Sequence, residues 1–127
     1  MTRHTIWILT TLTMLGCAGP VAIFPGGQLQ GEETPLTAPL EAGVLQLETR
    51  PTNPYSVNLG FVLIDAQMYI DPTPERTWYT HLQNNPEARV RIGDRADIHP
   101  IRVEEVTEPQ ILERFEDDRI VLRLLPR

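Results

Sequence analysis

The sequence contains no lysine, because all 11 of its basic residues are arginine. A lysine Schiff base and a phosphate-binding loop that ends in lysine are therefore excluded. Serine occurs once, at Ser56, and its neighbours do not form the Gly-x-Ser-x-Gly turn of serine hydrolases. No His-x-x-x-His or Cys-x-x-Cys pair is present, so a zinc site has no local support. The sequence thus offers few catalytic groups of its own, and no catalytic residue is assigned.

The single cysteine, Cys17, follows a hydrophobic stretch at the N-terminus. Arg3 and His4 precede the apolar residues 6–15, a run too short to cross a bilayer, which needs about 20 residues. This order is typical of a secretory signal peptide, and the cysteine at its end resembles a bacterial lipobox. The sequence predicts a signal peptide over residues 1–16 and lipidation of Cys17. The alternative is a buried free cysteine on an ordinary helix.

A lipid on Cys17 predicts a membrane-anchored protein of the cell envelope, because each buried methylene of an acyl chain contributes about 0.8 kcal/mol. Ala18 follows the cysteine, where some bacteria use Asp to mark inner-membrane retention. This favours the outer membrane, facing the periplasm, in a Gram-negative cell. The formal net charge is −6, so we expect no nucleic-acid partner and no electrostatic attraction to anionic lipid.

Residues 17–43 are rich in proline and glycine and show no periodicity. They are predicted to be a linker or a docked arm. Ile23 and Phe24 are exceptions to the polar trend and are the residues expected to hold part of such an arm on the folded domain. Strand patterns begin after Gly43, so a single domain is predicted over residues 44–127.

The domain is predicted to be mainly β, because short apolar or alternating runs are separated by turns rich in Pro, Asn, Gly and Asp. A turn is expected at Asp65-Ala66 and another at Gly93-Asp94. The predicted strands cover residues 44–49, 55–64, 67–70, 88–92, 95–106 and 120–125.

Two short helices are predicted between these strands. Thr73 is the expected N-cap of the first, which begins at Pro74 and continues to about residue 84. Thr107, with Gln three residues later, matches a capping box for the second. That second helix is expected to turn inward the residues Ile111, Leu112 and Phe115. The resulting order of strands and helices predicts a small six-stranded barrel.

Residues 76–95 form the most specific pattern, a helix that ends at Asn-Asn-Pro, an alternating strand and a Gly-Asp turn. This segment resembles the W-Y-x-x-L-x-x-(N/D)-P-x-(V/A)-x-V-x-(I/V)-G motif of the FMN-binding split-barrel superfamily. That superfamily includes pyridoxamine 5'-phosphate oxidase-like proteins and deazaflavin-dependent nitroreductases. The resemblance extends from about residue 44 to 127 and implies a split β-barrel. The matching residues are Trp78, Tyr79, Leu82, Asn85, Pro86, Ala88, Val90, Ile92 and Gly93.

The resemblance also implies a homodimer with FMN or a deazaflavin in a groove between the two copies. In the family, polar side chains and backbone N–H groups near the start of the helix hold the cofactor phosphate. Arg50 at the first loop is expected to reach the same groove. The matching cofactor-binding residues in this sequence are Asn58, Thr73, Arg76 and Trp78.

The residues leave alternatives open at three of these positions, one of which is Thr73, already expected as a helix cap. Arg76 could instead pair with Asp71 or Glu75, and Trp78 could be a core or dimer residue. Two functions therefore remain. One is a flavin- or deazaflavin-dependent oxidoreductase of a small quinone-like or nitro-like electron acceptor. The other is a cofactor-free module that binds a small molecule or a partner at the cell envelope.

Overall fold

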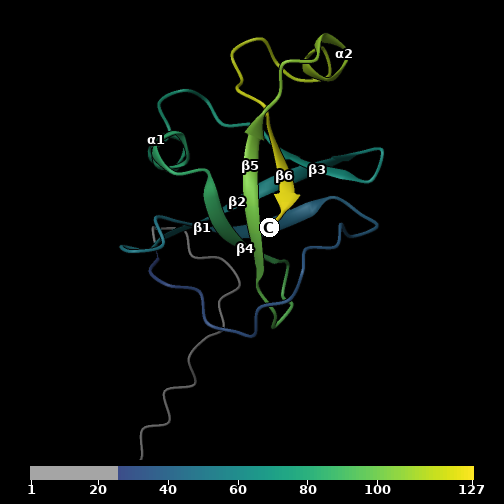
Figure 1. The fold of residues 1–127 in the computed structure, drawn as a ribbon. Coiled ribbons are helices and arrows are strands. Elements are labelled where there is room, and N and C mark those ends of the chain that lie inside the picture. The colour runs from purple at the N-terminus through teal and green to yellow at the C-terminus, as the bar shows by residue number, and fades with distance from the viewer. Residues whose placement is uncertain (1–25) are drawn as a thin grey trace, which may run out of the picture.

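The computed structural model describes residues 26–127, which contain six strands and two helices in the predicted order βββαββαβ (Figure 1). The signal peptide, the lipidation site at Cys17 and the pair Ile23-Phe24 lie outside the described residues. In the described part no helix is both long and apolar enough to cross a membrane. The strands are β1 (Gly43–Thr49), β2 (Tyr55–Ile64), β3 (Gln67–Ile70), β4 (Glu87–Ile92), β5 (His99–Glu105) and β6 (Leu122–Pro126); the helices are α1 (Thr77–Asn84) and α2 (Pro109–Leu112).

The six strands close into an antiparallel barrel in the order β1-β2-β3-β6-β5-β4. The prediction of a mainly β, six-stranded split barrel with two short helices is therefore confirmed. Alternation along the strands produces the core, since every second residue of β4 is buried and the residues between them are partly exposed. The barrel interior is apolar, and its fully buried members include Leu45, Leu47, Met68, Ile70, Val90, Ile101 and Leu124.

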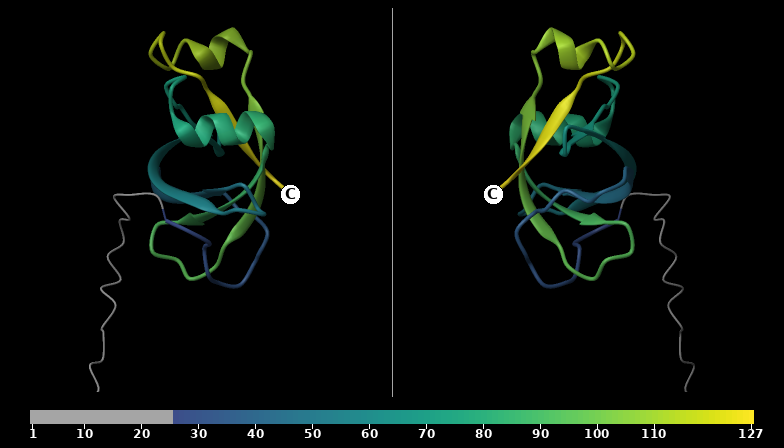
Figure 2. Two further views of the ribbon diagram at one scale, coloured as in Figure 1. Left: turned by 90° about the vertical axis from the view of Figure 1, so that its left-hand side faces the viewer. Right: turned by 90° about the vertical axis from the view of Figure 1, so that its right-hand side faces the viewer.

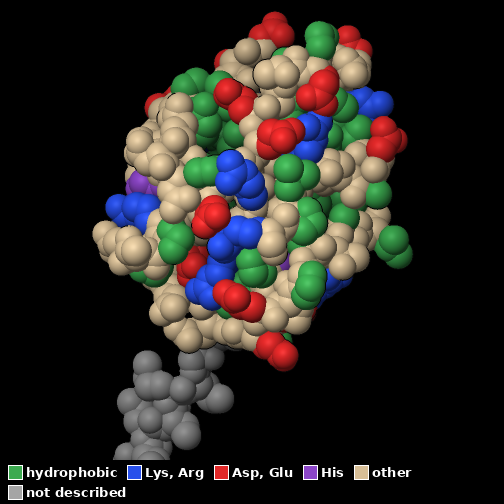
Figure 3. Space-filling model, viewed as in Figure 1, with side chains coloured by type: hydrophobic (Ala, Val, Ile, Leu, Met, Phe, Trp, Pro, Cys, Tyr) green, Lys and Arg blue, Asp and Glu red, His purple; other side chains and the backbone are tan. Residues whose placement is uncertain are grey.

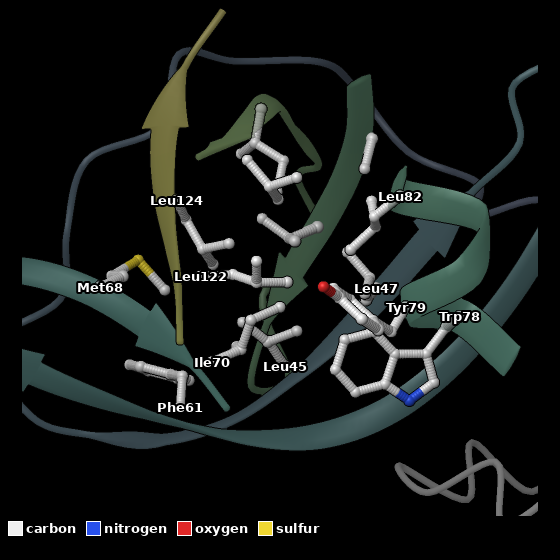
Figure 4. Packing of buried hydrophobic residues seen from close by; sticks show 14 of the residues in the cluster. Leu45, Leu47, Phe61, Met68, Ile70, Trp78, Tyr79, Leu82, Leu122 and Leu124 are labelled. Atoms are coloured by element: carbon white, nitrogen blue, oxygen red, sulfur yellow. The ribbon is translucent and has the colours of Figure 1, made fainter. Parts of the chain in front are cut away.

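Helix α1 covers one opening of this barrel with its apolar face. Trp78, Tyr79 and Leu82 are buried, and Figure 4 shows them pointing from α1 toward the strand residues of the interior. The helix begins at Thr77, three residues later than predicted. The N-terminal cap at Thr73 is wrong, because residues 73–76 form a turn in which the Arg76 N–H donates to the carbonyl of Thr73. Proline at the second position of a turn gives the same local signal as proline at a helix start.

Helix α2 lies at the end of the barrel opposite residues 26–42, over a second, smaller apolar cluster (Figure 2). Ile111 and Phe115 pack against that cluster as predicted, but Leu112 is exposed. The capping box at Thr107 is wrong, since the N-cap residue is Glu108 and its side chain makes no cap hydrogen bond. The Glu108 carboxylate instead pairs with Arg123 of β6, and this contact lowers the pKa of Glu108.

Residues 26–42 form an arm that packs along the outside of β1 and β4 (Figure 2). Leu29 is buried, and bridges join Gly26 to Ser56 and Glu33 to Ile98. The two alternatives for this segment were a linker and a docked arm. From Gly26 onward its residues form a docked arm. The strand predicted to start at residue 95 begins only at His99, because residue 98 pairs with the arm rather than with the barrel strands.

Candidate functional site

The barrel is split beside the long strand β2. Strand β3 pairs with β2 only from Val62 to Ile64, although β2 begins seven residues earlier at Tyr55. On this side of β2 the chain between β3 and α1 passes across the gap and leaves a cavity of about 420 Å³. Its lining comes from β2 (residues 57–62), the segment before α1 (Asp71, Pro72, Thr73 and Arg76), Trp78 of α1 and Arg119.

Four of the five predicted cofactor-binding residues line this one cavity. Asn58 lies on β2, Thr73 and Arg76 lie in the turn before α1, and Trp78 lies in the first turn of the helix. The turn brings Thr73 and Arg76 together through the hydrogen bond of their backbones, at 3.2 Å. The structure thus assembles a guanidinium, a hydroxyl, an amide and an indole around one space.

Arg76 has an exposed side chain with no hydrogen bond or ion pair to any residue that the structure describes. The alternative pairing of Arg76 with Asp71 is not formed, because Asp71 pairs with Arg119. No ion pair between Arg76 and Glu75 is formed either within residues 26–127. A guanidinium has five N–H donors in a flat fork and is suited to a phosphate or carboxylate.

Trp78 is both a core residue and a lining residue of the cavity. Its side chain is only 8% exposed and belongs to the main core cluster, as the core alternative predicts. It also lines the cavity beside β2. An aromatic wall that is fixed by core packing can hold a flat ring in one orientation, because the indole loses little further freedom when a ligand binds.

Arg119 is a cavity residue that sequence reasoning missed. Its Nη1 donates to the backbone carbonyl of Asp71 at 2.9 Å and lies 3.4 Å from the carboxylate of the same residue. Its Nε is buried and has no hydrogen-bond partner in the described part of the chain, where the carboxylates of Glu116 and Asp118 are both 3.8 Å away. The acidic run before Arg119 suggests only a solvated turn, so the sequence carries no signal for this contact across 48 residues.

Arg50 lies outside this cavity. It has a left-handed backbone (φ 57°), and its guanidinium lies over the ring of Tyr55, 5.7 Å from the centroid. With His81 it lines a separate pocket of about 210 Å³ near the end of α1. Burial, and then the positive charge of Arg50, lower the pKa of His81 below its ordinary value of 6.5. The structure therefore does not bring Arg50 to the other four predicted residues.

The chemistry of the cavity is that of binding rather than of acid–base catalysis. It contains one carboxylate, Asp71, which is already paired with Arg119. Within residues 26–127 no group of three His, Cys, Asp or Glu side chains is placed to hold a metal ion. What remains is the Arg76 guanidinium, which has no partner among residues 26–127, beside hydroxyl, amide and aromatic groups. This donor set fits an anionic group joined to a flat ring system.

No family model matches the chain, and no curated protein does. Among solved structures, the chain is similar to a candidate pyridoxamine 5'-phosphate oxidase from Listeria innocua. The two are 16% identical over 66% of this chain and 83% of the other, with a TM-score of 0.56. HutZ, a haem storage protein from Vibrio cholerae, is 18% identical over 66% of this chain and 81% of its own, with a TM-score of 0.50.

A FAD-binding protein from Mesorhizobium loti is 19% identical over 66% of this chain and 78% of its own. Its TM-score of 0.47 is below the level at which a shared fold can be argued. The similarities to the first two structures show that this chain has the split-barrel fold of the pyridoxamine 5'-phosphate oxidase-like proteins.

Proposed function

Starting from the split-barrel fold of the pyridoxamine 5'-phosphate oxidase-like proteins, we propose that this chain binds a flavin nucleotide and serves as an oxidoreductase of a small electron acceptor. The cofactor is FMN or a deazaflavin, held in the cavity beside β2. The observation that carries the proposal is Arg76, which lines the cavity with no partner among the described residues. A charged group left without a counter-charge beside an open cavity is a typical anchor for a ligand phosphate.

Each residue of the cavity has a role in this proposal. Arg76 makes a two-pronged contact to the phosphate, and the Thr73 hydroxyl donates a further hydrogen bond. Asn58 contributes its amide, and Trp78 forms the wall against the flavin ring. The cofactor supplies the hydride chemistry, so no acid or base of the protein is required. The cavity volume of about 420 Å³ falls within the usual range of ligand pockets, roughly 300–1,000 Å³.

The active form is proposed to be a homodimer. The cavity is open along β2, and Val62 at its rim is 38% exposed although it is apolar. A second copy placed over this opening would exclude water from the ring of the ligand and cover Val62. The split-barrel resemblance implies the same arrangement, with the cofactor between two copies.

The protein is further proposed to be an exported lipoprotein. Cys17 would be the new N-terminus after cleavage and would carry the lipid anchor. The support is the order of basic, apolar and cysteine residues at the start of the sequence. In this setting a membrane-dissolved acceptor such as a quinone is within reach of the cavity.

A cofactor-free binding module is the second candidate function. It is favoured by two observations. Arg50, which was expected to help bind the phosphate, lines a different pocket. Asp71 also places a carboxylate in the cavity wall, and its pairing occupies part of the Arg119 guanidinium. Such a cavity could accept a neutral or zwitterionic small molecule at the envelope.

The test is a titration of the full chain, in detergent, with FMN, with a deazaflavin and with haem, followed by absorption spectroscopy. The proposal predicts a flavin spectrum that shifts on binding. Arg76→Ala should weaken binding about 10- to 100-fold, since hydrogen bonds to charged groups contribute about 1.5–3 kcal/mol. Arg95→Ala is the matched control, an exposed arginine outside the cavity. Binding of haem alone, or no coloured complex at all, would retire the flavin proposal.

A further inference from the structure

The pocket that Arg50 shares with His81 lies where the loop between β1 and β2 meets the end of α1, and its volume is about 210 Å³. Its lining contains one arginine and one histidine, together with the amide side chains of Asn53, Asn84 and Asn85. Among the described residues that line it there is no aspartate or glutamate, although the chain has 17 acidic residues against 11 basic ones. The charge that this pocket presents to a ligand is therefore positive.

The Arg50 guanidinium is held in place without being used by the described chain. It lies over the ring of Tyr55, 5.7 Å from the centroid. Its Nε is buried and has no hydrogen-bond partner within residues 26–127, and no ion pair joins the guanidinium to a carboxylate in that range. A guanidinium that is fixed in this way is suited to the two oxygens of a phosphate or carboxylate group.

The hydrogen bonds of His81 leave its second ring nitrogen without a partner. The Thr49 hydroxyl donates its one hydrogen to the carbonyl of Tyr55 at 3.3 Å, so it accepts a hydrogen bond from Nδ1 of His81 at 2.9 Å. This pattern assigns the hydrogen of the neutral ring to Nδ1. Nε2 then carries no hydrogen, and it has no partner within the described residues. A protonated ring carries a second N–H donor at Nε2, which is suited to an anion.

The amide groups add further donors to the same pocket. Oδ1 of Asn85 accepts the N–H of Glu87 at 3.0 Å, so its NH₂ group, which has no partner among residues 26–127, is the end left for a ligand. Asn53 and Asn84 line the pocket with exposed side chains. The pocket thus combines one permanent cation, one side chain that becomes a cation on protonation, and several N–H donors.

We propose that this pocket is a second binding site, which takes a small oxyanion, a phosphate or carboxylate group, together with one proton. Arg50 pairs with the anion, and His81 takes up the proton on Nε2 and donates it in a hydrogen bond to the anion. This inference goes beyond the proposed flavin function and does not depend on it, because the pocket shares no lining residue with the cavity beside β2.

The uptake of a proton follows from the charges around His81. Burial, and then the positive charge of Arg50, lower the pKa of His81. A bound anion offsets the charge of Arg50 and stabilises the imidazolium, so it raises this pKa. Among the described residues that line the pocket, Arg50 and His81 are the charged or titratable ones. The ring of Tyr55 packs against both of them, with its centroid 4.9 Å from that of His81.

The first test follows the imidazole signals of the full chain in detergent by NMR, since the sequence contains three histidines, His4, His81 and His99. The probes are sodium phosphate and sodium acetate, with sodium chloride at matched ionic strength as the control. We expect either probe to move the His81 signals saturably, with a dissociation constant of about 1–10 mM. At saturation the pKa of His81 should rise by about one unit.

The tighter of the two probes identifies the group that the pocket prefers. The signals of His4 and His99 should change no more with the probes than with chloride. A His81 response that does not saturate, that equals the response to chloride, or that is shared by all three histidines would overturn the proposal.

Arginine variants then locate the bound ion. Arg50→Gln should weaken phosphate binding about 10- to 100-fold, the loss expected when a hydrogen-bonded charged group is removed. Arg95→Gln is the matched control, an exposed arginine that lines neither cavity, and it should leave the affinity unchanged. If the His81 response is lost in Arg76→Gln and kept in Arg50→Gln, the ion binds in the cavity beside β2 and the second site is refuted. The flavin titration is unaffected by either result, so the two proposals fail separately.

A second variant tests the charge of the pocket without removing Arg50. Asn84→Asp places a carboxylate in the lining at an exposed position, and its repulsion should weaken phosphate binding at least about 3-fold. Gln110→Glu is the matched control, because it adds the same charge at an exposed position of α2, outside the pocket. Equal weakening in the two variants, or none in Asn84→Asp, would contradict the proposed site.

Discussion

The side of β1 that adjoins β4 and the side of β2 that adjoins the split differ in whether their arginines have partners. On the β1–β4 flank the arm covers the sheet, and Arg89 lies between two carboxylates (Figure 3 shows the basic and acidic side chains mixed over this face). On the β2 flank the sheet is split, and Arg76 extends beside a cavity with no partner in the described chain. The two residues are chemically identical, so the difference lies in what the fold brings to them.

The Arg89 site shows how fully a guanidinium can be satisfied. Its Nε donates to Glu48 at 2.7 Å, and its Nη2 donates to the other oxygen of the same carboxylate at 2.8 Å. Glu48 also accepts the N–H of Leu29 at 2.6 Å, although its side chain is only 4% exposed. The hydrogen bonds to Glu48 raise the pKa of Arg89 further above its ordinary value, so the guanidinium stays charged. Arg89 therefore holds the arm in place and is not available to a ligand.

The largest change in stability is expected from the removal of Arg89, the arginine that is paired with two carboxylates. Arg89→Ala should lower the free energy of unfolding by about 3–5 kcal/mol, because it leaves Glu48 buried without a counter-charge. The measurement is the midpoint of urea unfolding. Arg102→Ala is the control, an exposed arginine on the neighbouring strand, and it should change stability by less than about 0.5 kcal/mol. A loss of similar size in both variants would mean that the Glu48 pair contributes little.

A smaller effect is expected from the apolar contact of the arm. Leu29→Ala should cost about 2–3 kcal/mol, since Leu29 is 6% exposed and its truncation leaves a cavity between the arm and the barrel. Thermal unfolding followed by circular dichroism measures this loss. Leu40→Ala, in the same arm but fully exposed, should have almost no effect. Equal behaviour of the two leucines would show that the arm does not contribute to stability in solution.

Mutation of the two arginines on the β2 flank, Arg76 and Arg119, should separate a ligand-binding role from a structural one. Arg119→Gln should cost about 1–2 kcal/mol of stability, because Arg119 ties the carbonyl of Asp71 to the loop after α2. Arg76→Gln should change stability by less than about 0.5 kcal/mol while lowering flavin affinity. Urea unfolding and flavin titration of both variants separate the two roles. A destabilised Arg76→Gln protein would indicate a structural partner for Arg76.

The smallest effect is a pH dependence at His81. Burial and Arg50 lower the pKa of His81 in the folded chain below 6.5, so folding favours the neutral ring. This stability is present above the unfolded pKa and is lost as the pH falls through 6.5 toward the folded value. The difference in unfolding free energy between pH 7.5 and pH 5.5 should therefore shrink in His81→Gln. An unchanged difference would mean that other groups account for the acid sensitivity.

Local patterns predicted the barrel well because strand alternation and turn residues act over a few positions. The alternation at Ala88, Val90 and Ile92 marked a half-buried strand, and the structure places all three in the core. The predicted turn at Asp65-Ala66 is also present, with both residues in the left-handed region. The start of α1 was misplaced because proline gives the same signal in a turn as at a helix start.

Contacts between distant segments could not be predicted in the same way. The alternation along residues 88–92 indicates only that Arg89 lies on the outer face of a strand, yet Arg89 contacts an acid 41 residues earlier in the chain. The pairing of Arg119 with Asp71 spans 48 residues and has no motif. The family resemblance did indicate Asn58, Thr73, Arg76 and Trp78, which meet at one cavity, but the position of Arg50 depends on a loop that the motif does not cover.

The bridge between Gly26 and Ser56 also has a practical consequence for how the protein can be handled. Ser56 is the immediate neighbour of the first cavity residue on β2, so Gly26 lies beside the cavity. A purification tag or a solid support joined directly to Gly26 would therefore be attached close to the opening. The C-terminal Arg127 lies instead near Glu87 and the arm-covered flank, and is the better handle for immobilised binding assays.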